Sequence, residues 1–262
     1  MSVPKTSDER REALKEVFLA ARACERCPQL VATRTQVVFG AGNADADLMF
    51  VGEAPGRDED EQGLPFVGRS GQLLNTLLGE IGLRRDDVFI ANVLKCRPPQ
   101  NRDPHPEEIE RCSPYLWRQL ELIQPTVVVT LGNFATKLLR AEPTGIRQIH
   151  GRAEERVLGR RRVRLLPVYH PAAALRSAVN LEELRADFAT IPALIAQGAP
   201  AQPEPVGSER EPSAEEIAAA RDAVAGEAEA GPQPAAGARE TAGDGTAAGE
   251  QPPSPDAQLG LF

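Results

Sequence analysis

The stretch Asp47-Leu-Met-Phe-Val-Gly-Glu-Ala-Pro-Gly56 joins a short apolar run to a turn rich in glycine and proline. A continuous apolar run bounded by such breakers is typical of a strand that is buried on both faces. Three further runs of this kind lie at 87–94, 126–131 and 163–169. Together with 47–52 they predict a central four-stranded parallel sheet.

Helical patterns alternate with these runs, so the sequence predicts an α/β fold with helices flanking the sheet. The expected helices span 8–23, 70–82, 106–123, 133–140 and 180–196. Ligands of such sheets bind outside the carboxyl ends of the strands. We therefore expect a site built from residues 52–56, 92–101 and 169–176.

The composition changes sharply near residue 197. Residues 197–262 hold 3 basic and 12 acidic residues, a net charge of −9, which leaves residues 1–196 with 27 and 26 and a net charge of +1. Ala, Glu, Pro and Gly dominate the acidic part, a composition that cannot bury enough apolar surface to fold. We expect one folded domain at 1–196 and a disordered linker at 197–257.

Membrane and export signals are missing from the sequence, which has neither an apolar stretch of 18 residues nor an apolar segment after Met1. These features favour a cytoplasmic protein. Nothing in the sequence indicates a stable oligomer, and we expect a monomer.

Four cysteines are expected to meet in the fold: Cys24 and Cys27 form a C-x-x-C, Cys96 follows a predicted strand, and Cys112 lies in a predicted helix. In a reducing compartment such thiols are more often metal ligands or free thiols than disulfides. A structural zinc ion, an iron–sulfur cluster and four unrelated thiols all fit the spacing.

Five other residues stand out at or near the expected site. Glu53 follows the first strand, and Asn92 ends the second among apolar neighbours, where a polar side chain needs a partner. Phe66 lies between breakers and is suited either to the core or to stacking on a base. Asn101 suits a turn, and His170 precedes a proline directly after the last strand.

The order and spacing of these motifs closely resemble those of the family 4 uracil-DNA glycosylases over about residues 20–190. The motifs are the four cysteines, Gly-Glu-Ala-Pro-Gly at 52–56, Gly-Leu-Pro-Phe-Val-Gly at 63–68, Asn-Val-Leu-Lys-Cys-Arg-Pro-Pro at 92–99 and His-Pro-Ala-Ala-Ala-Leu-Arg at 170–176. The resemblance implies a uracil-DNA glycosylase fold, single- and double-stranded uracil-containing DNA as substrate, and a 4Fe-4S cluster on Cys24, Cys27, Cys96 and Cys112.

The resemblance also implies roles for single residues. Phe66 is expected to stack on an extruded uracil, Asn92 to read its O4 and N3–H edge, and His170 to donate a hydrogen bond to O2. The uracil-binding set includes the backbone of Glu53 and Ala54, with Pro55 beside them. Glycosidic hydrolysis needs a carboxylate near the attacking water. Glu53 is the first candidate for it and Glu59 the second.

Three residues are expected to contact DNA. Asn101 lies in the polar loop, and Leu175 and Arg176 resemble a segment that similar enzymes insert into the minor groove. Ordinary packing at a helix start is the alternative for Leu175 and Arg176.

The last five residues resemble the pentapeptide by which bacterial proteins bind the replicative sliding clamp. Gln258, Leu259, Leu261 and Phe262 are the expected contacts, since an apolar cluster after a polar linker suits a pocket on a partner.

Two other functions remain open from the sequence. One is a related uracil-binding type that traps its substrate covalently through a histidine in a basic insert. His105 lies in a comparable loop, but this loop is short and lacks the basic run. The other is a zinc-stabilised nucleic-acid-binding module without catalysis.

Overall fold

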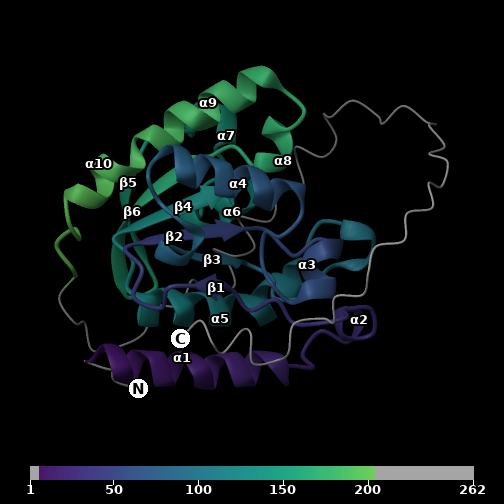
Figure 1. Ribbon diagram of the computed structural model, residues 1–262. Coiled ribbons are helices and arrows are strands. Elements are labelled where there is room, and N and C mark those ends of the chain that lie inside the picture. Colours follow the sequence, from purple (N-terminus) through teal and green to yellow (C-terminus); the bar gives the residue numbers. More distant parts are fainter. Residues whose placement is uncertain (1–5, 204–262) are drawn as a thin grey trace, which may run out of the picture.

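The computed structural model describes residues 6–203 (Figure 1). Its four central strands confirm the predicted parallel sheet: β2 (Leu48–Gly52), β3 (Phe89–Asn92), β4 (Val127–Leu131) and β6 (Arg161–Val168). The sheet order is β1-β3-β2-β4-β6-β5. Gly52 pairs with Asn92 in register, so the carboxyl ends of β2 and β3 bring two of the predicted site segments together.

Two antiparallel edge strands extend the predicted four-stranded sheet to six strands. β1 (Ala41–Gly42) pairs with β3, and β5 (Glu154–Leu158) pairs with β6. β1 is only two residues long, which is too short to leave a pattern in the sequence. β5 begins with three charged residues that alternate between half-buried and exposed, as on an edge strand, and therefore does not give a continuous apolar run.

Four helices match the expected positions closely: α1 (Ser7–Arg22), α4 (Arg69–Glu80), α5 (Pro106–Ile123) and α6 (Asn133–Arg140). The fifth predicted helix, at 180–196, is instead divided into α9 (Ala178–Ala189) and α10 (Ile191–Ala196). Thr190 closes α9 by donating from its backbone N–H and its hydroxyl to the carbonyl of Asp187. Pro192, which lacks an N–H, falls in the first turn of α10, where none is needed.

The sequence patterns did not predict the shortest helices: α2 (Pro28–Val31), α3 (Arg57–Gln62), α7 (Ile146–Ile149), α8 (Pro171–Ala174), and the 3-10 turns η1 (Arg85–Asp87) and η2 (Pro99–Asn101). Six or fewer residues cannot show a helical period. Three of these elements, α3, α8 and η2, carry parts of the site described below.

The sheet is covered on both faces (Figure 1). Met49 and Val51 point into one core together with residues of α1, α5 and α6, and Leu48 and Phe50 point into the other with residues of α4, α9 and α10. Alternate residues of one strand therefore face opposite layers. In the second core, the Phe50 ring stacks on that of Phe188 with centroids 5.7 Å apart.

Within residues 6–203 no helix is long and apolar enough to cross a membrane. α10 ends at Ala196, and Gln202 beyond it still exchanges hydrogen bonds with the backbone of Arg162 in β6. Most of the predicted linker and all of the predicted clamp-binding residues lie outside the described part of the chain.

Candidate active site

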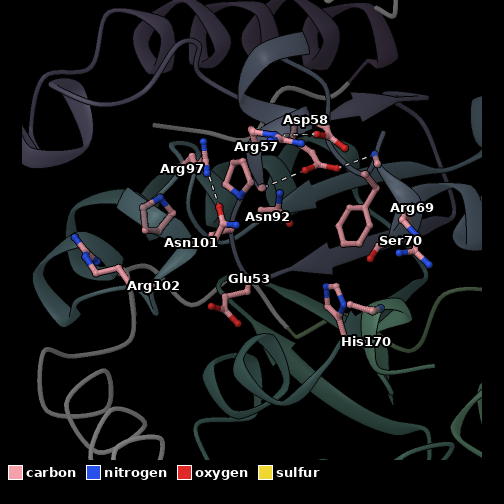
Figure 2. A pocket seen from close by; sticks show the side chains of 18 residues that line it. Glu53, Arg57, Asp58, Arg69, Ser70, Asn92, Arg97, Asn101, Arg102 and His170 are labelled. Carbon is pink, nitrogen blue, oxygen red and sulfur yellow. Dashed lines mark hydrogen bonds and ion pairs between the residues drawn. The ribbon is translucent and has the colours of Figure 1, made fainter. Parts of the chain in front are cut away.

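A cavity of about 670 Å³ opens at the carboxyl ends of β2, β3 and β6, where the sequence placed the site (Figure 2). Figure 2 shows Glu53, Asn92 and His170 around this cavity. The lining residues are Glu53, Ala54, Pro55, Gly56, Arg57, Asp58, Glu59, Phe66, Gly68, Arg69, Ser70, Asn92, Arg97, Pro98, Asn101, Arg102, His170 and Ala172.

Asn92 forms part of the wall at the end of β3 and is almost completely buried. Its Oδ1 has no hydrogen-bond partner in the described part of the chain. A buried amide without a partner is costly unless a ligand completes it. Gly52 leaves room for this arrangement, because a Cβ there would lie 2.4 Å from Asn92 Oδ1 and 2.8 Å from the Phe66 ring.

His170 follows β6 and caps the short helix α8. Its Nδ1 accepts a hydrogen bond from the backbone N–H of Ala172 at 3.1 Å. Burial lowers the pKa of His170 to about 4, so the ring is neutral near physiological pH. Since Nδ1 is an acceptor, the single proton lies on Nε2, which leaves that atom as a hydrogen-bond donor. The ring lies 5.7 Å from that of Phe66, centroid to centroid.

Glu53 is the first residue after β2 and lies partly buried in the cavity wall. Burial raises the pKa of Glu53 to about 7, and the negative charge of the nearby Asp103 carboxylate contributes to this increase. A carboxyl group with this pKa exchanges its proton near neutral pH, which is a common property of catalytic acids and bases.

Glu59 also lines the cavity, but both of its oxygens are engaged by backbone amides. Oε2 accepts from Gly56 N at 3.1 Å, and Oε1 accepts from Val67 N at 3.0 Å and Gly68 N at 3.1 Å. The carboxylate thus ties the start of α3 to the loop that carries Phe66. This geometry favours Glu53 over Glu59 as the carboxylate that faces a reacting group.

Of the predicted DNA contacts, Asn101 lines the cavity, whereas Leu175 and Arg176 follow α8 and are not among the lining residues. Asn101 lies on the rim with a left-handed backbone, and its Oδ1 accepts from Arg97 Nε at 2.7 Å. Leu175 ends α8 with 42% of its surface exposed, and Arg176 beside it is exposed as well. Leu175 belongs to neither of the two hydrophobic cores.

The family model of the uracil DNA glycosylase superfamily matches residues 39–190, which include all six strands and every residue that lines the cavity. This chain belongs to the uracil-DNA glycosylase superfamily.

Within the superfamily, the chain is similar to proteins named type-4 uracil-DNA glycosylase. It is 48% identical to that of Archaeoglobus fulgidus over 184 residues, which cover 69% of this chain and 92% of the relative. It is 44% identical to that of Thermotoga maritima over 177 residues, 67% of this chain and 89% of the relative. A type-5 enzyme of Pyrobaculum aerophilum is 33% identical over 183 residues, 57% of this chain and 78% of the relative. These similarities confirm the predicted type-4 membership.

The pocket of this superfamily member also contains residues that the sequence did not reveal. Arg57, Arg69, Ser70 and Arg102 line the cavity. Arginines are common in exposed polar segments, so the sequence alone does not indicate which of them line a cavity. The helix α3, which places Arg57, was not predicted either. His105, the residue considered for covalent trapping, is exposed at the start of α5 and does not line the cavity.

The four cysteines are free thiols. Burial raises the pKa of Cys27, Cys96 and Cys112. Negative charge on neighbouring cysteines raises the pKa of each of them further. The four side chains therefore share one electrostatic environment. Within residues 6–203, however, no three or more His, Cys, Asp or Glu side chains are gathered as a group that could hold a metal ion.

Hydrogen-bond donors surround these sulfurs. Arg34 Nη1 donates to Cys96 Sγ at 3.2 Å, Arg26 Nε to Cys24 Sγ at 3.3 Å, and the backbone N–H of Lys95 to Cys112 Sγ at 3.2 Å. Such donors stabilise thiolate ligands of a metal group. The donors at Cys24, Cys96 and Cys112 therefore fit the chemistry of thiolate ligands.

Proposed function

We propose that this protein is a uracil-DNA glycosylase of base-excision repair, which takes uracil out of the DNA stack and hydrolyses its N-glycosidic bond to leave an abasic site. The observation that carries the proposal is the unpartnered Oδ1 of Asn92, buried in a cavity beside Phe66 and His170. The similarity to type-4 uracil-DNA glycosylases supports the same activity.

Asn92 supplies base selectivity. Its Oδ1 accepts from uracil N3–H while its amide N–H donates to O4. Cytosine offers the opposite pattern at these positions and would leave buried polar groups unpaired, which is strongly unfavourable. Phe66 stacks on the base, and the segment from Glu53 to Pro55 closes the pocket around it.

His170 stabilises the leaving group. Charge develops on the uracil oxygens as the glycosidic bond breaks, and a positioned neutral donor stabilises that charge. The hydrogen bond from Ala172 N–H fixes the proton on Nε2, so this atom donates to O2. Glu53 orients the water that attacks the sugar and offsets the positive charge on it, while Glu59 positions the Phe66 loop.

DNA lies across the arginine-bearing mouth of the cavity, where Arg57, Arg69, Arg97 and Arg102 offset phosphate charge. Asn101 contacts the strand that carries the uracil. Leu175 enters the space left by the extruded nucleotide, and Arg176 contacts the adjoining backbone. Both single- and double-stranded DNA are substrates.

We assign a 4Fe-4S cluster to Cys24, Cys27, Cys96 and Cys112. When bound, the cluster supplies structural organisation rather than hydrolytic chemistry. The four free thiols with N–H donors around them support this assignment, and zinc is the alternative for the same thiolates. A zinc-stabilised module without catalysis would have no use for the neutral donor of His170 in the pocket.

We further infer from the sequence that residues 258–262 bind the replicative sliding clamp through Gln258, Leu259, Leu261 and Phe262, with 197–257 as the linker. We also propose that the protein works as a cytoplasmic monomer.

The decisive experiment is uracil release from a single-stranded and a U:G duplex oligonucleotide by anaerobically purified protein. Asn92→Ala and His170→Ala should each lower the single-turnover rate constant by about 100- to 1000-fold, because each removes a group that stabilises the departing uracil. The same preparation should be brown with broad visible absorption, whereas a zinc protein is colourless.

Several outcomes would contradict these proposals. Tight binding of uracil-containing DNA without release would favour a binding protein, and a DNA adduct that survives SDS would favour covalent trapping. A colourless, active preparation that contains zinc would contradict only the cluster assignment and would leave the glycosylase assignment intact.

A further inference from the structure

Phe66 holds an unusual backbone conformation. Its φ is +49°, in the left-handed region that non-glycine residues rarely adopt. Its side chain is nevertheless almost fully buried and lines the cavity beside His170. A residue in this region keeps its conformation only where the surrounding structure imposes it.

Arg85 holds the carbonyl side of this loop. Its Nη1 donates to Phe66 O at 3.1 Å, its Nη2 donates to the carbonyl of Pro65, and Nη1 also reaches Asn75 Oδ1 at 3.3 Å. The two nitrogens of one guanidinium therefore fix two successive carbonyls. Burial lowers the pKa of Arg85, and the charges of Asp86 and Glu59 partly offset this effect.

Glu59 and α4 hold the other sides of the loop. Glu59 accepts from the amides of Val67 and Gly68, directly after the residue that Arg85 holds. The backbone of α4 lies against the Phe66 carbonyl, since a Cβ on Gly71 would come within 1.8 Å of that oxygen. Phe66 is thus fixed from three directions.

We propose that Arg85 is a positioning residue for base recognition, which sets the Phe66 ring against the extruded uracil by holding the backbone of Phe66. This inference rests on the proposed function. Arg85 does not line the cavity, so it acts through Phe66 and not by touching the substrate. The three acceptors of Arg85 lie in the Phe66 loop or on the adjoining helix α4. This side chain therefore holds the loop and is not part of a hydrophobic core.

The test measures single-turnover uracil excision and dissociation constants for uracil-containing DNA in Arg85→Met, Arg85→Lys and Arg84→Met. Arg85→Met should slow excision by about 10- to 100-fold, because small displacements of a positioning group have effects of this size. Arg85→Lys should be similarly slow, since lysine keeps the charge but cannot hold both carbonyls. Arg84→Met is the matched control: its side chain is 78% exposed and pairs with Asp87, away from the Phe66 loop, so excision should be unchanged.

A double-mutant cycle separates positioning from general stability. In a Phe66→Leu background, Arg85→Met should slow excision by no more than about 3-fold, because the ring that Arg85 places is already absent. Equal losses in both backgrounds, or full activity of Arg85→Lys, would overturn the inference. An inactive wild-type protein would instead overturn the proposed function, so the two failures are distinguishable.

Discussion

At the scale of single residues, the pocket has one group that titrates near neutral pH. His170, with a pKa of about 4, is neutral throughout the usual assay range, whereas Glu53 has a pKa of about 7. A group with a raised carboxyl pKa is protonated below that value and ionised above it. The ionised form is the one that orients water and offsets positive charge on the sugar.

The single-turnover rate constant should therefore rise with pH up to about 7 and level off above it. Glu53→Gln should remove this pH-dependent rise and lower the plateau rate constant by about 10- to 100-fold, while leaving DNA affinity nearly unchanged. A pH–rate profile of both proteins measures this. If the rate constant of the variant still rose with pH up to about 7, the titrating group would be a residue other than Glu53.

The same substitution should stabilise the fold at higher pH. The carboxylate is solvated in the unfolded chain but desolvated in the cavity, so ionised Glu53 destabilises the native state above its unfolded pKa. Urea unfolding at about pH 8 should show Glu53→Gln to be more stable by roughly 1 to 3 kcal/mol, and the gain should shrink toward about pH 4. Glu61→Gln, on the exposed face of α3, is the control and should change little.

The sequence indicated Glu53, Phe66, Asn92 and His170, because their motifs resemble those of a known family. It could not indicate the tautomer of His170, which depends on a backbone N–H two residues away. Nor could it indicate Arg85, whose partners are main-chain carbonyls and leave no trace in residue types.

At the scale of elements, α8 begins next to His170 and is capped at its other end by the exposed Leu175. We expect Leu175→Ala to slow excision from a U:G duplex by about 10-fold and to leave excision from single strands nearly unchanged, because only a duplex must be held open. Val157→Ala, at a similarly exposed position on β5, is the control. Equal losses on both substrates would show that Leu175 shapes the pocket instead.

The long elements were predictable because they bury regular patterns. The observed limits of α5 and α6 coincide with the predicted ones, and the four central strands are the four apolar runs. The short elements depend on tertiary contacts. The first turn of α3, for example, is held by the hydrogen bond from Gly56 N to the Glu59 carboxylate. Asp60 of α3 is buried, and its carboxylate accepts a hydrogen bond from Thr35 N at 3.0 Å.

At the scale of the whole molecule, the clamp motif and the catalytic domain should be separable. Deleting residues 258–262 should abolish pull-down by the sliding clamp and spare excision on short oligonucleotides, because the motif lies far in sequence from the pocket residues. Replacing Leu261 and Phe262 by alanine should have the same effect. Retained pull-down would contradict clamp binding through this motif.

Composition alone leads us to expect a folded domain at 1–196, but it could not predict which strands form the edges of the sheet. Its two outermost strands differ from the central ones in a way that affects the behaviour of concentrated protein. β1 offers only two residues to an incoming strand, and β5 carries Glu154, Glu155 and Arg156. Short or charged borders discourage edge-to-edge pairing between molecules. The central apolar strands, which would aggregate if exposed, are thereby shielded from neighbouring copies.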